Sequence, residues 1–241
     1  MTATFNSAST ILDARKSVLK QSHPYVEHLI VDGLSGDKTL DLIREVDQTN
    51  LIIDSRPDDG IYDALNRGVR LATGDVVGFL HSDDYFTDES VLECVANGFE
   101  DPSIDICYGD LAYVAKLDTD KVVRRWRAGE FSRSKLRFGW MPPHPTLYVR
   151  REILQENLFN LDYHISADYD AILRLLANER HKVSYLRKEL VRMRLGGVSN
   201  KSLANIWKKT REDWRAIRSN NAGGILTLIS KNVRKLPQFL V

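Results

Sequence analysis

The sequence predicts an α/β fold in which a mostly parallel, Rossmann-like sheet is flanked by helices. Three observations support this prediction. Short apolar runs, at residues 28–32, 51–54 and 76–80, alternate with segments of helical periodicity. The connections between them are short, and each run ends on a carboxylate or is soon followed by one. Strands and helices that alternate through tight connections are typical of a doubly wound parallel sheet.

The first half of the chain follows this pattern closely. Ile11, Ala14 and Val18 have the spacing of a helix, which Pro24 ends. The run at 76–80 has no polar alternation, which favours a strand that is buried on both faces. In chain order we expect helices at 9–21, around 40–46 and at 61–72 between the strands, and residues 2–4 form at most a very short first strand.

The second half is less regular. Thr87 or Asp88 can cap a helix that ends near Phe99. Three prolines within residues 142–145 exclude regular structure there and indicate a shaped loop. In chain order we expect strands at 104–108 and 111–115, a hairpin near 122–126 and a helix at 168–176.

Composition limits the class of protein. The chain of 241 residues is long enough to bury a sizeable core, and its hydrophobic fraction of 43% is ordinary for a globular protein. Cys94 and Cys107 lack the spacing of metal ligands, so reduced thiols are expected. The sequence contains no apolar run that could span a bilayer and no N-terminal signal sequence. We therefore expect a cytoplasmic protein.

Charge is distributed unevenly along the chain. Residues 180–241 carry 15 Lys and Arg against 3 Asp and Glu, although the whole chain has a net charge of only +1. We expect one domain at 1–200 and a basic, amphipathic helical tail at 201–241, which can lie on an anionic membrane surface. A helix packed on the domain or in a dimer is the alternative. Nucleic acid is not an expected partner, because no readout module accompanies the charge.

Carboxylates follow several of the predicted strands or begin a helix. Asp32 ends one strand, Asp83 and Asp84 follow another, and Asp168 begins a helix. In open α/β sheets such positions face one crevice, where ligands bind. Helix capping is the alternative for Asp32 and Asp168. Two adjacent acids repel each other unless a cation offsets them, which favours a hard divalent cation shared with substrate phosphates.

Short motifs in a fixed order cover roughly residues 3 to 180. They include Asp59-Gly60-Ile61-Tyr62-Asp63-Ala64-Leu65-Asn66-Arg67-Gly68 and Ser82-Asp83-Asp84, and the others lie at 4–7, 17–22, 27–39, 72–75, 144–146 and 167–170. With this ordered set, the sequence resembles the family 2 glycosyltransferases of the GT-A fold. These are inverting enzymes that use nucleotide-sugar donors, and some build cell-surface polysaccharides.

The resemblance implies a donor site and a metal. Asp84 matches the last acid of the family's D-x-D-type motif and would bind Mg²⁺ or Mn²⁺, with Ser82 at the first position of that motif. The metal would bridge the donor's two phosphates and stabilise charge on the leaving nucleoside diphosphate. A UDP-sugar is the expected donor. The residues implied in donor binding are Thr4, Asn6, Asp32, Asp59, Asn66, Arg67 and Asp83.

The resemblance also implies a general base and an acceptor site. Asp168 falls on the position of the base, which accepts the proton of the acceptor hydroxyl during attack on the anomeric carbon. His144 either contacts the acceptor or makes a structural hydrogen bond, and residues 196–199 form either a lid or an ordinary turn. A saccharide or a lipid-linked saccharide is the expected acceptor. The location is then the cytoplasm or the inner face of the cell membrane.

One departure from the family concerns the first strand. Family members usually begin with a longer apolar strand in the middle of the sheet, and here only residues 2–4 match it. The alternative function is therefore a non-catalytic remnant that binds nucleotide sugars and lacks the first strand. A sugar-phosphate nucleotidylyltransferase is disfavoured, because the chain has no Gly- and Arg-rich phosphate loop near its start.

Overall fold

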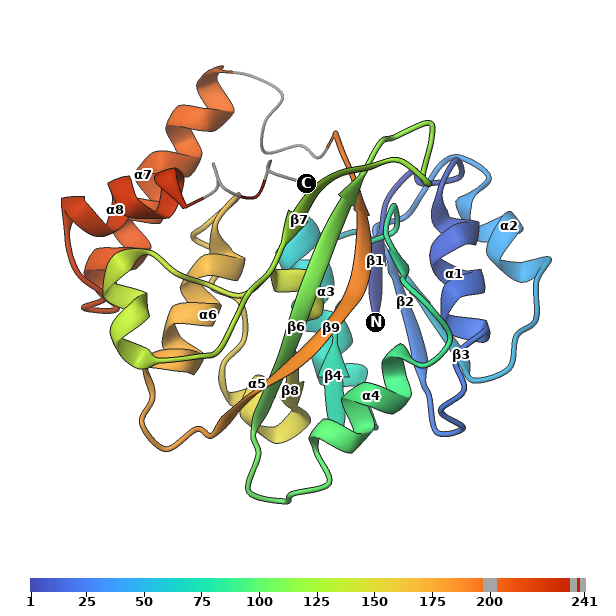
Figure 1. The fold of residues 1–241 in the computed structure, drawn as a ribbon. Coiled ribbons are helices and arrows are strands. Elements are labelled where there is room, and N and C mark those ends of the chain that lie inside the picture. The colour runs from blue at the N-terminus through green and yellow to red at the C-terminus, as the bar shows by residue number, and fades with distance from the viewer. Residues whose placement is uncertain (197–202, 235–237, 239–241) are drawn as a thin grey trace.

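The computed structural model describes residues 1–196, 203–234 and 238. Two sheets lie side by side, with helices around them (Figure 1). The N-terminal sheet is parallel in the order β1-β2-β3, as predicted. Its strands are β1 (Thr2–Thr4), β2 (His28–Asp32) and β3 (Leu51–Ser55), and the helices that connect them and follow them are α1 (Ile11–Leu19), α2 (Thr39–Arg44) and α3 (Ile61–Leu71).

Strand β2 shows why this sheet needs helices on both faces. Its five residues are all buried, and successive side chains point to opposite faces. Ile30 packs with Ile11 of α1 and Ile43 of α2. Val31 belongs instead to the large cluster that contains Leu65 of α3. The continuous apolar run therefore fits a strand that is covered on both sides.

The second sheet is mixed and has the order β4-β8-β6-β9-β5, with β7 paired to β6. Only β6 and β9 are parallel to each other, and the other pairs are antiparallel. The run at 76–80 forms β4, which is shorter than expected and pairs antiparallel to β8. The strands are β4 (Val76–Gly78), β5 (Tyr85–Phe86), β6 (Ile106–Val114), β7 (Val122–Trp126), β8 (Tyr148–Arg150) and β9 (Val183–Arg194).

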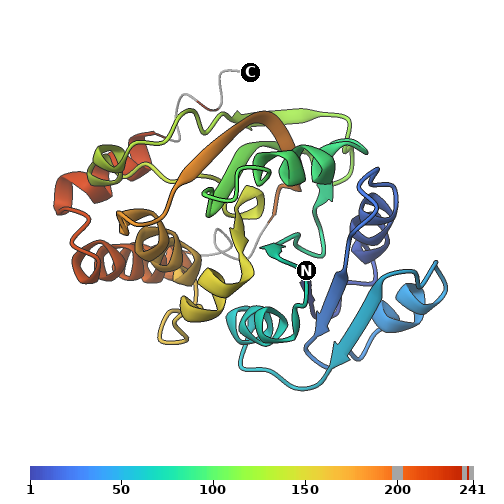
Figure 2. The same cartoon turned by 90° about the horizontal axis from the view of Figure 1, so that it is seen from below.

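Met1 joins the two sheets. Its amino group donates a hydrogen bond to the carbonyl of Gly78 at 2.8 Å, and the amide of Leu80 donates to the carbonyl of Met1 at 2.9 Å. The short β1 therefore lies between β2 and β4, the central place that the sequence predicted. Figure 2 shows the N-terminus between the blue sheet and the rest of the molecule.

The helices of the second half surround the mixed sheet. Helix α4 starts after Ser90, two to three residues beyond the expected cap at Thr87 or Asp88. The predicted loop at 141–145 is irregular only as far as Pro143, because His144 and Pro145 belong to a short 3-10 helix, η2. The remaining helices are α4 (Val91–Gly98), α5 (Arg151–Glu156), α6 (Ala167–Ala177), α7 (Leu203–Ser219) and α8 (Ile225–Val233), with the 3-10 helices η1 (Arg133–Phe138) and η2 (His144–Thr146).

Helices α7 and α8 occupy most of the described part of the predicted tail. Helix α7 packs on α6 and α8, and α8 packs on η1 (Figure 1). A salt bridge of 2.7 Å between Lys231 and Asp213 is buried in this contact. Among the described residues, none of the helices combines the length and the apolar character that crossing a bilayer requires.

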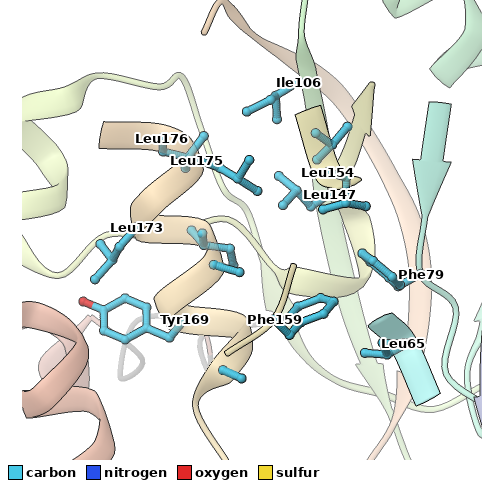
Figure 3. Packing of buried hydrophobic residues seen from close by; sticks show 14 of the residues in the cluster. Leu65, Phe79, Ile106, Leu147, Leu154, Phe159, Tyr169, Leu173, Leu175 and Leu176 are labelled. Atoms are coloured by element: carbon cyan, nitrogen blue, oxygen red, sulfur yellow. The ribbon is translucent and has the colours of Figure 1, made fainter. Parts of the chain in front are cut away.

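The largest apolar cluster connects the sheets to α6. Figure 3 shows Leu173, Leu175 and Leu176 of α6 on one side of this cluster and Phe79 and Leu65 on the other. The ring of Phe159 lies between these groups and contacts the ring of Phe79 edge-on, with 5.4 Å between the ring centroids. The core thus fixes the start of α6 relative to the end of β4, and both of these segments carry predicted site residues.

Candidate active site

Asp32 lies at the end of β2 and is fully buried. Its carboxylate accepts hydrogen bonds from the amide of Ser35 at 3.0 Å and from the hydroxyls of Ser35 and Ser55 at 2.5 and 2.7 Å. Two donors of Ser35, in the loop after β2, and one of Ser55, at the end of β3, therefore hold an acid that the resemblance implies in donor binding. Each carboxylate oxygen has two lone-pair directions, so the group retains capacity for a further donor.

The loop after β1 lies beside Asp32. Asn6 has a positive φ of 50°, and its side-chain oxygen accepts a hydrogen bond from the amide of Gly36 at 2.9 Å. The hydroxyl of Thr4 is buried and has no hydrogen-bond partner within the described residues. Ser7 and Ser82 bring their hydroxyls within 3.0 Å of each other. The segment that carries Thr4 and Asn6, which the resemblance implies in donor binding, therefore contacts the motif that carries Asp83 and Asp84.

Asn66 and Arg67 are tied to the protein itself. The amide group of Asn66 makes two hydrogen bonds of 2.8 Å, one to the carbonyl and one from the amide of Phe159. The guanidinium of Arg67 pairs with Asp54 at 2.6 Å and donates to the carbonyl of Asp32 at 3.0 Å. Both side chains are buried and bind neighbouring segments of the chain. The sequence did not predict this structural role.

Asp59 differs from that pair in its exposure to solvent. It is exposed, and its amide donates a hydrogen bond to the carboxylate of Asp63 at 3.3 Å. The donor contacts that the sequence assigns to Asp59, Asn66 and Arg67 stay predictions.

Asp83 and Asp84 follow β4. Asp84 is completely buried: its Oδ1 accepts a hydrogen bond from the amide of Arg194 at 3.2 Å, and its Oδ2 has no partner within the described residues. Burial, and then the charge of Asp83, raise the pKa of Asp84 well above its ordinary value. Asp83 is only half-buried and is the more accessible of the two acids.

These acids fit a divalent cation. A buried carboxylate oxygen without a partner, next to a second carboxylate, is costly unless a positive charge offsets it. Within the described residues, no three His, Cys, Asp or Glu side chains form a group that could hold a metal. Mg²⁺ commonly takes one or two protein carboxylates and completes its ligands with water and substrate phosphates. The donor set is therefore suited to a metal that is shared with a diphosphate.

Asp168 lies in the first turn of α6 and is half-buried. Its Oδ1 accepts a hydrogen bond from the amide of Tyr169 at 2.8 Å and lies 3.4 Å from the hydroxyl of Tyr62. The same hydroxyl donates to the carbonyl of Ile165 at 2.7 Å. Burial, together with the charge of Asp168, raises the pKa of Tyr62, so this phenol remains a donor.

Two histidines lie between the acidic groups. The rings of His81 and His144 are 5.8 Å apart, and the ring of His144 stacks on Phe79 at 5.3 Å. His144 is buried, and neither of its ring nitrogens has a hydrogen-bond partner within the described residues. Burial lowers the pKa of His144 to about 4, although Asp168 acts in the opposite direction. The imidazole of His144 is therefore neutral near pH 7.

His81 feels the charges of both Asp83 and Asp168. Burial lowers the pKa of His81, while Asp83 and Asp168 both act to raise it, so this ring lies within the electrostatic reach of both acids. The sequence did not single out His81, although an imidazole directly before Ser82 was an available signal. Arg194 and Glu212 were also missed, because they lie on β9 and α7, far along the chain from the segments that they bind.

The predicted lid begins at Gly196, whose φ is +125°. Its other residues, 197–199, lie outside the described residues.

Comparison with known proteins agrees with the family resemblance of the sequence. The model of the family described as "Glycosyl transferase family 2" matches residues 1–158, which is more than half of the chain. A "PGL/p-HBAD biosynthesis glycosyltransferase" of Mycobacterium bovis (strain BCG / Pasteur 1173P2) is 34% identical over 205 residues, which cover 82% of this chain and 77% of that protein.

Solved structures agree on the fold. TarS 1-349 of S. aureus in complex with UDP-GlcNAc matches with a TM-score of 0.69 and 18% identity, over 99% of this chain and 70% of that one. The mannosyltransferase PcManGT from Pyrobaculum calidifontis, in complex with GDP-Man and Mn²⁺, matches with a TM-score of 0.68 and 18% identity, over 99% and 71% of the two chains. The predicted GT-A fold is thereby confirmed, and the chain is a glycosyltransferase that belongs to glycosyl transferase family 2.

Proposed function

We propose that this glycosyltransferase moves a hexosyl or N-acetylhexosaminyl group from a nucleotide-diphosphate donor to a hydroxyl of a saccharide acceptor, with inversion. The observation that carries the proposal is the grouping of Asp83, Asp168 and two imidazoles beyond the end of β4. The rings of His81 and His144 are 5.8 Å apart, and the ring of His144 lies 5.8 Å from that of Phe159. The ring of Phe159 lies 5.6 Å from that of Tyr62, whose hydroxyl is 3.4 Å from Asp168. Within one site, Asp168 would then serve the acceptor hydroxyl, and Asp83 would serve the donor.

Asp168 is the proposed general base. Its half-buried carboxylate would accept the proton of the acceptor hydroxyl as the oxygen attacks the anomeric carbon. The bond between that carbon and the diphosphate breaks as the new glycosidic bond forms on the opposite face, and the nucleoside diphosphate leaves with the electron pair. Direct displacement of this kind requires no covalent intermediate with the enzyme.

Asp84 is the proposed ligand of Mg²⁺ or Mn²⁺, and Asp83 lies beside the ribose or the donor sugar. The metal, when bound, would stabilise negative charge on the departing diphosphate. A UDP-sugar is the proposed donor, and GDP-sugars remain in the test because neighbouring structures bind UDP-GlcNAc or GDP-Man. The neutral ring of His144 is proposed to contact the acceptor.

Membrane contact is a further part of this proposal, since a lipid-linked saccharide would lie at the inner face of the cell membrane. Ile225, Leu226, Ile229 and Val233 of α8 are more than half exposed, and Phe138 is 60% exposed. Phe138 lies beside α8, because its carbonyl accepts a hydrogen bond from Ser230 at 2.8 Å. Residues 214–241 contain no acid, and Arg137 and Arg234 are exposed in this region. An apolar face with a basic border fits an anionic lipid surface.

The test uses thermal melting with Mn²⁺ and a panel of UDP-, GDP- and dTDP-sugars, because a ligand that binds the folded state raises the melting temperature. A metal-dependent shift with one nucleotide class, followed by sugar transfer that Asp168→Asn slows by about 100- to 10,000-fold, is the expected result. A shift without transfer to saccharide or lipid-linked acceptors would favour the alternative, a binding protein that is not catalytic.

Membrane contact is tested by sedimentation with vesicles of phosphatidylglycerol and phosphatidylcholine. Leu226→Asp is expected to reduce binding, whereas Leu117→Asp, at a residue that is 98% exposed in the connection between β6 and β7, serves as the matched control. Equal binding of both variants would contradict the proposed contact.

A further inference from the structure

Helix α7 holds the segment that leads into α6. The carboxylate of Glu212 accepts hydrogen bonds from three consecutive backbone amides, those of His164, Ile165 and Ser166, at 3.2, 2.8 and 2.9 Å. Glu212 is only 8% exposed, so these charge-assisted bonds are shielded from water. A side chain from residue 212 therefore determines the backbone path at 164–166, immediately before Asp168.

The usual local cap of α6 is missing. Ser166 occupies the N-cap position, but its side chain makes no capping hydrogen bond and its hydroxyl is buried without a partner within the described residues. Glu212 binds the amide of this same residue and places a negative charge near the positive end of the α6 dipole. Glu212 of α7 thus supplies the acceptor for the start of α6 that the side chain of Ser166 does not supply.

The held segment is connected directly to Asp168. The carbonyl of Ile165 accepts the hydrogen bond of the Tyr62 hydroxyl at 2.7 Å, and that hydroxyl lies 3.4 Å from Oδ1 of Asp168. A shift of residue 165 would therefore move the phenol that lies against the carboxylate. Glu212 acts on Asp168 through this chain of contacts and does not touch it.

The next residue of α7 supports the other side of Asp168. Asp213 forms a buried salt bridge of 2.7 Å with Lys231 of α8, and the Lys231 ammonium lies 3.3 Å from the centre of the Tyr169 ring. Tyr169 directly follows Asp168. Two neighbouring acids of α7 therefore fix the backbone before Asp168 and the ring after it.

We propose that Glu212 is a positioning residue for Asp168 and that α7 is thereby part of the catalytic machinery. This inference rests on the proposed role of Asp168 as general base. A catalytic carboxylate must be held within a fraction of an ångström of its working position, and misplacement by about 1 Å can cost on the order of 100-fold in rate.

The test compares Glu212→Gln with Glu179→Gln. Gln keeps the size of the side chain, but its amide nitrogen would face one of the backbone N–H groups, so part of the triple contact is lost. Glu179 is exposed just beyond the other end of α6 and serves as the control. We expect Glu212→Gln to lower kcat by about 10- to 100-fold and to leave the KM for the donor within about twofold. The control should retain wild-type kcat.

A double variant separates positioning from general destabilisation. If Glu212 acts through Asp168, Glu212→Gln should reduce the rate little further once Asp168→Asn is present. Losses that multiply in the double variant, or a kcat of Glu212→Gln within twofold of wild type, would overturn the inference.

Hydrogen exchange supplies a readout that does not depend on activity. Amides 164–166 should exchange faster in Glu212→Gln while the core of α6 stays protected, and unchanged exchange at these amides would count against the inference. If the wild-type chain transfers no sugar, the proposed function fails. Exchange then still decides whether Glu212 holds this segment, although a role in positioning a base would be excluded.

Discussion

Arg194 at the end of β9 holds Asp84 through its own backbone, because its amide donates a hydrogen bond to Oδ1 of the buried carboxylate at 3.2 Å. Its guanidinium donates to the carbonyl of Asp83 at 2.6 Å and pairs with Asp13 of α1 at 2.5 Å. One arginine thus connects the paired acids to α1 and β9. It determines the backbone path of the acids and adds positive charge beside Asp84.

Arg194→Ala should therefore weaken metal-dependent donor binding. The hydrogen bond from the backbone N–H of residue 194 to Asp84 remains in this variant. The carbonyl of Asp83 and the carboxylate of Asp13, however, lose the guanidinium that binds them. We expect about a tenfold loss in donor affinity and a loss of roughly 1–3 kcal/mol in the free energy of unfolding. Calorimetric titration and denaturant melts measure the two effects. Arg187→Ala, which removes an exposed arginine of the same strand, should change neither, and equal effects of both substitutions would contradict the prediction.

Asp83→Asn and Asp84→Asn should separate the two acids. With Asp84 as the metal ligand, Asp84→Asn abolishes the effect of Mn²⁺ on donor binding, whereas Asp83→Asn weakens donor binding but leaves it metal-dependent. The buried Asp84 has a raised pKa, so a neutral Asn costs the apo protein little stability. Melting with and without Mn²⁺ measures both effects. If only Asp83→Asn removes the metal dependence, the ligand is the accessible acid and Asp84 is structural.

Asn66→Ala should act on stability more than on donor affinity. The substitution removes two buried hydrogen bonds to the backbone of Phe159 and leaves that carbonyl and amide unpaired. We expect a loss of roughly 2–4 kcal/mol in the free energy of unfolding, measured by denaturant melts. The exposed Asn97 of α4 gives the matched control Asn97→Ala, which should change little. A stable Asn66→Ala variant with weak donor binding would instead assign Asn66 to the donor.

The sequence was sufficient where local pattern determines structure. The apolar run 28–32 corresponds to β2, and the acids at strand ends and at the start of α6 were found from position alone. The direction of β4 was not predictable, because its partner β8 lies about 70 residues away and an apolar run does not reveal the direction of its neighbour. The role of Glu212 was not predicted for the same reason, since a carboxylate on a basic helix gives no local sign of the three amides that it binds.

Stability should fall as the pH is lowered from about 6.5. Burial lowers the pKa of His144 to about 4 and also lowers those of His28 and His81, so the folded state keeps these rings neutral while the unfolded state binds protons near pH 6.5. The stability that the neutral rings contribute is complete above that value, and for His144 it is lost between about 6.5 and 4. For His144 alone this loss is about 3 kcal/mol.

Melts between pH 7.5 and 4.5 test this expectation. His144→Gln should show a shallower loss of stability with falling pH than the wild type. His164→Gln, at an exposed histidine, should follow the wild-type curve. Parallel curves for the wild type and His144→Gln would show that the ring of His144 is not held neutral.

Residues added before Met1 should stabilise the fold. The Met1 amino group is buried against Gly78, and burial lowers its pKa to about 5. Beside it lies a cavity of about 500 Å³ that Leu29 of β2 and Val77 of β4 help to line. Strand β1 pairs with β2 only from Ile30 onward, so within the described residues His28 and Leu29 have no β1 partner on that side.

Four β-forming apolar residues ahead of Met1 would continue β1 between β2 and β4, fill part of this cavity and replace the buried amine by a neutral amide. Each methylene group that becomes buried contributes about 0.8 kcal/mol, against roughly 1–2 kcal/mol of backbone entropy for each ordered residue. A net gain of a few kcal/mol follows, which corresponds to a rise of several degrees in Tm. An extension of the same length made of Gly and Ser is the control. Equal melting temperatures for the two extensions would show that the space between β2 and β4 does not accept a strand.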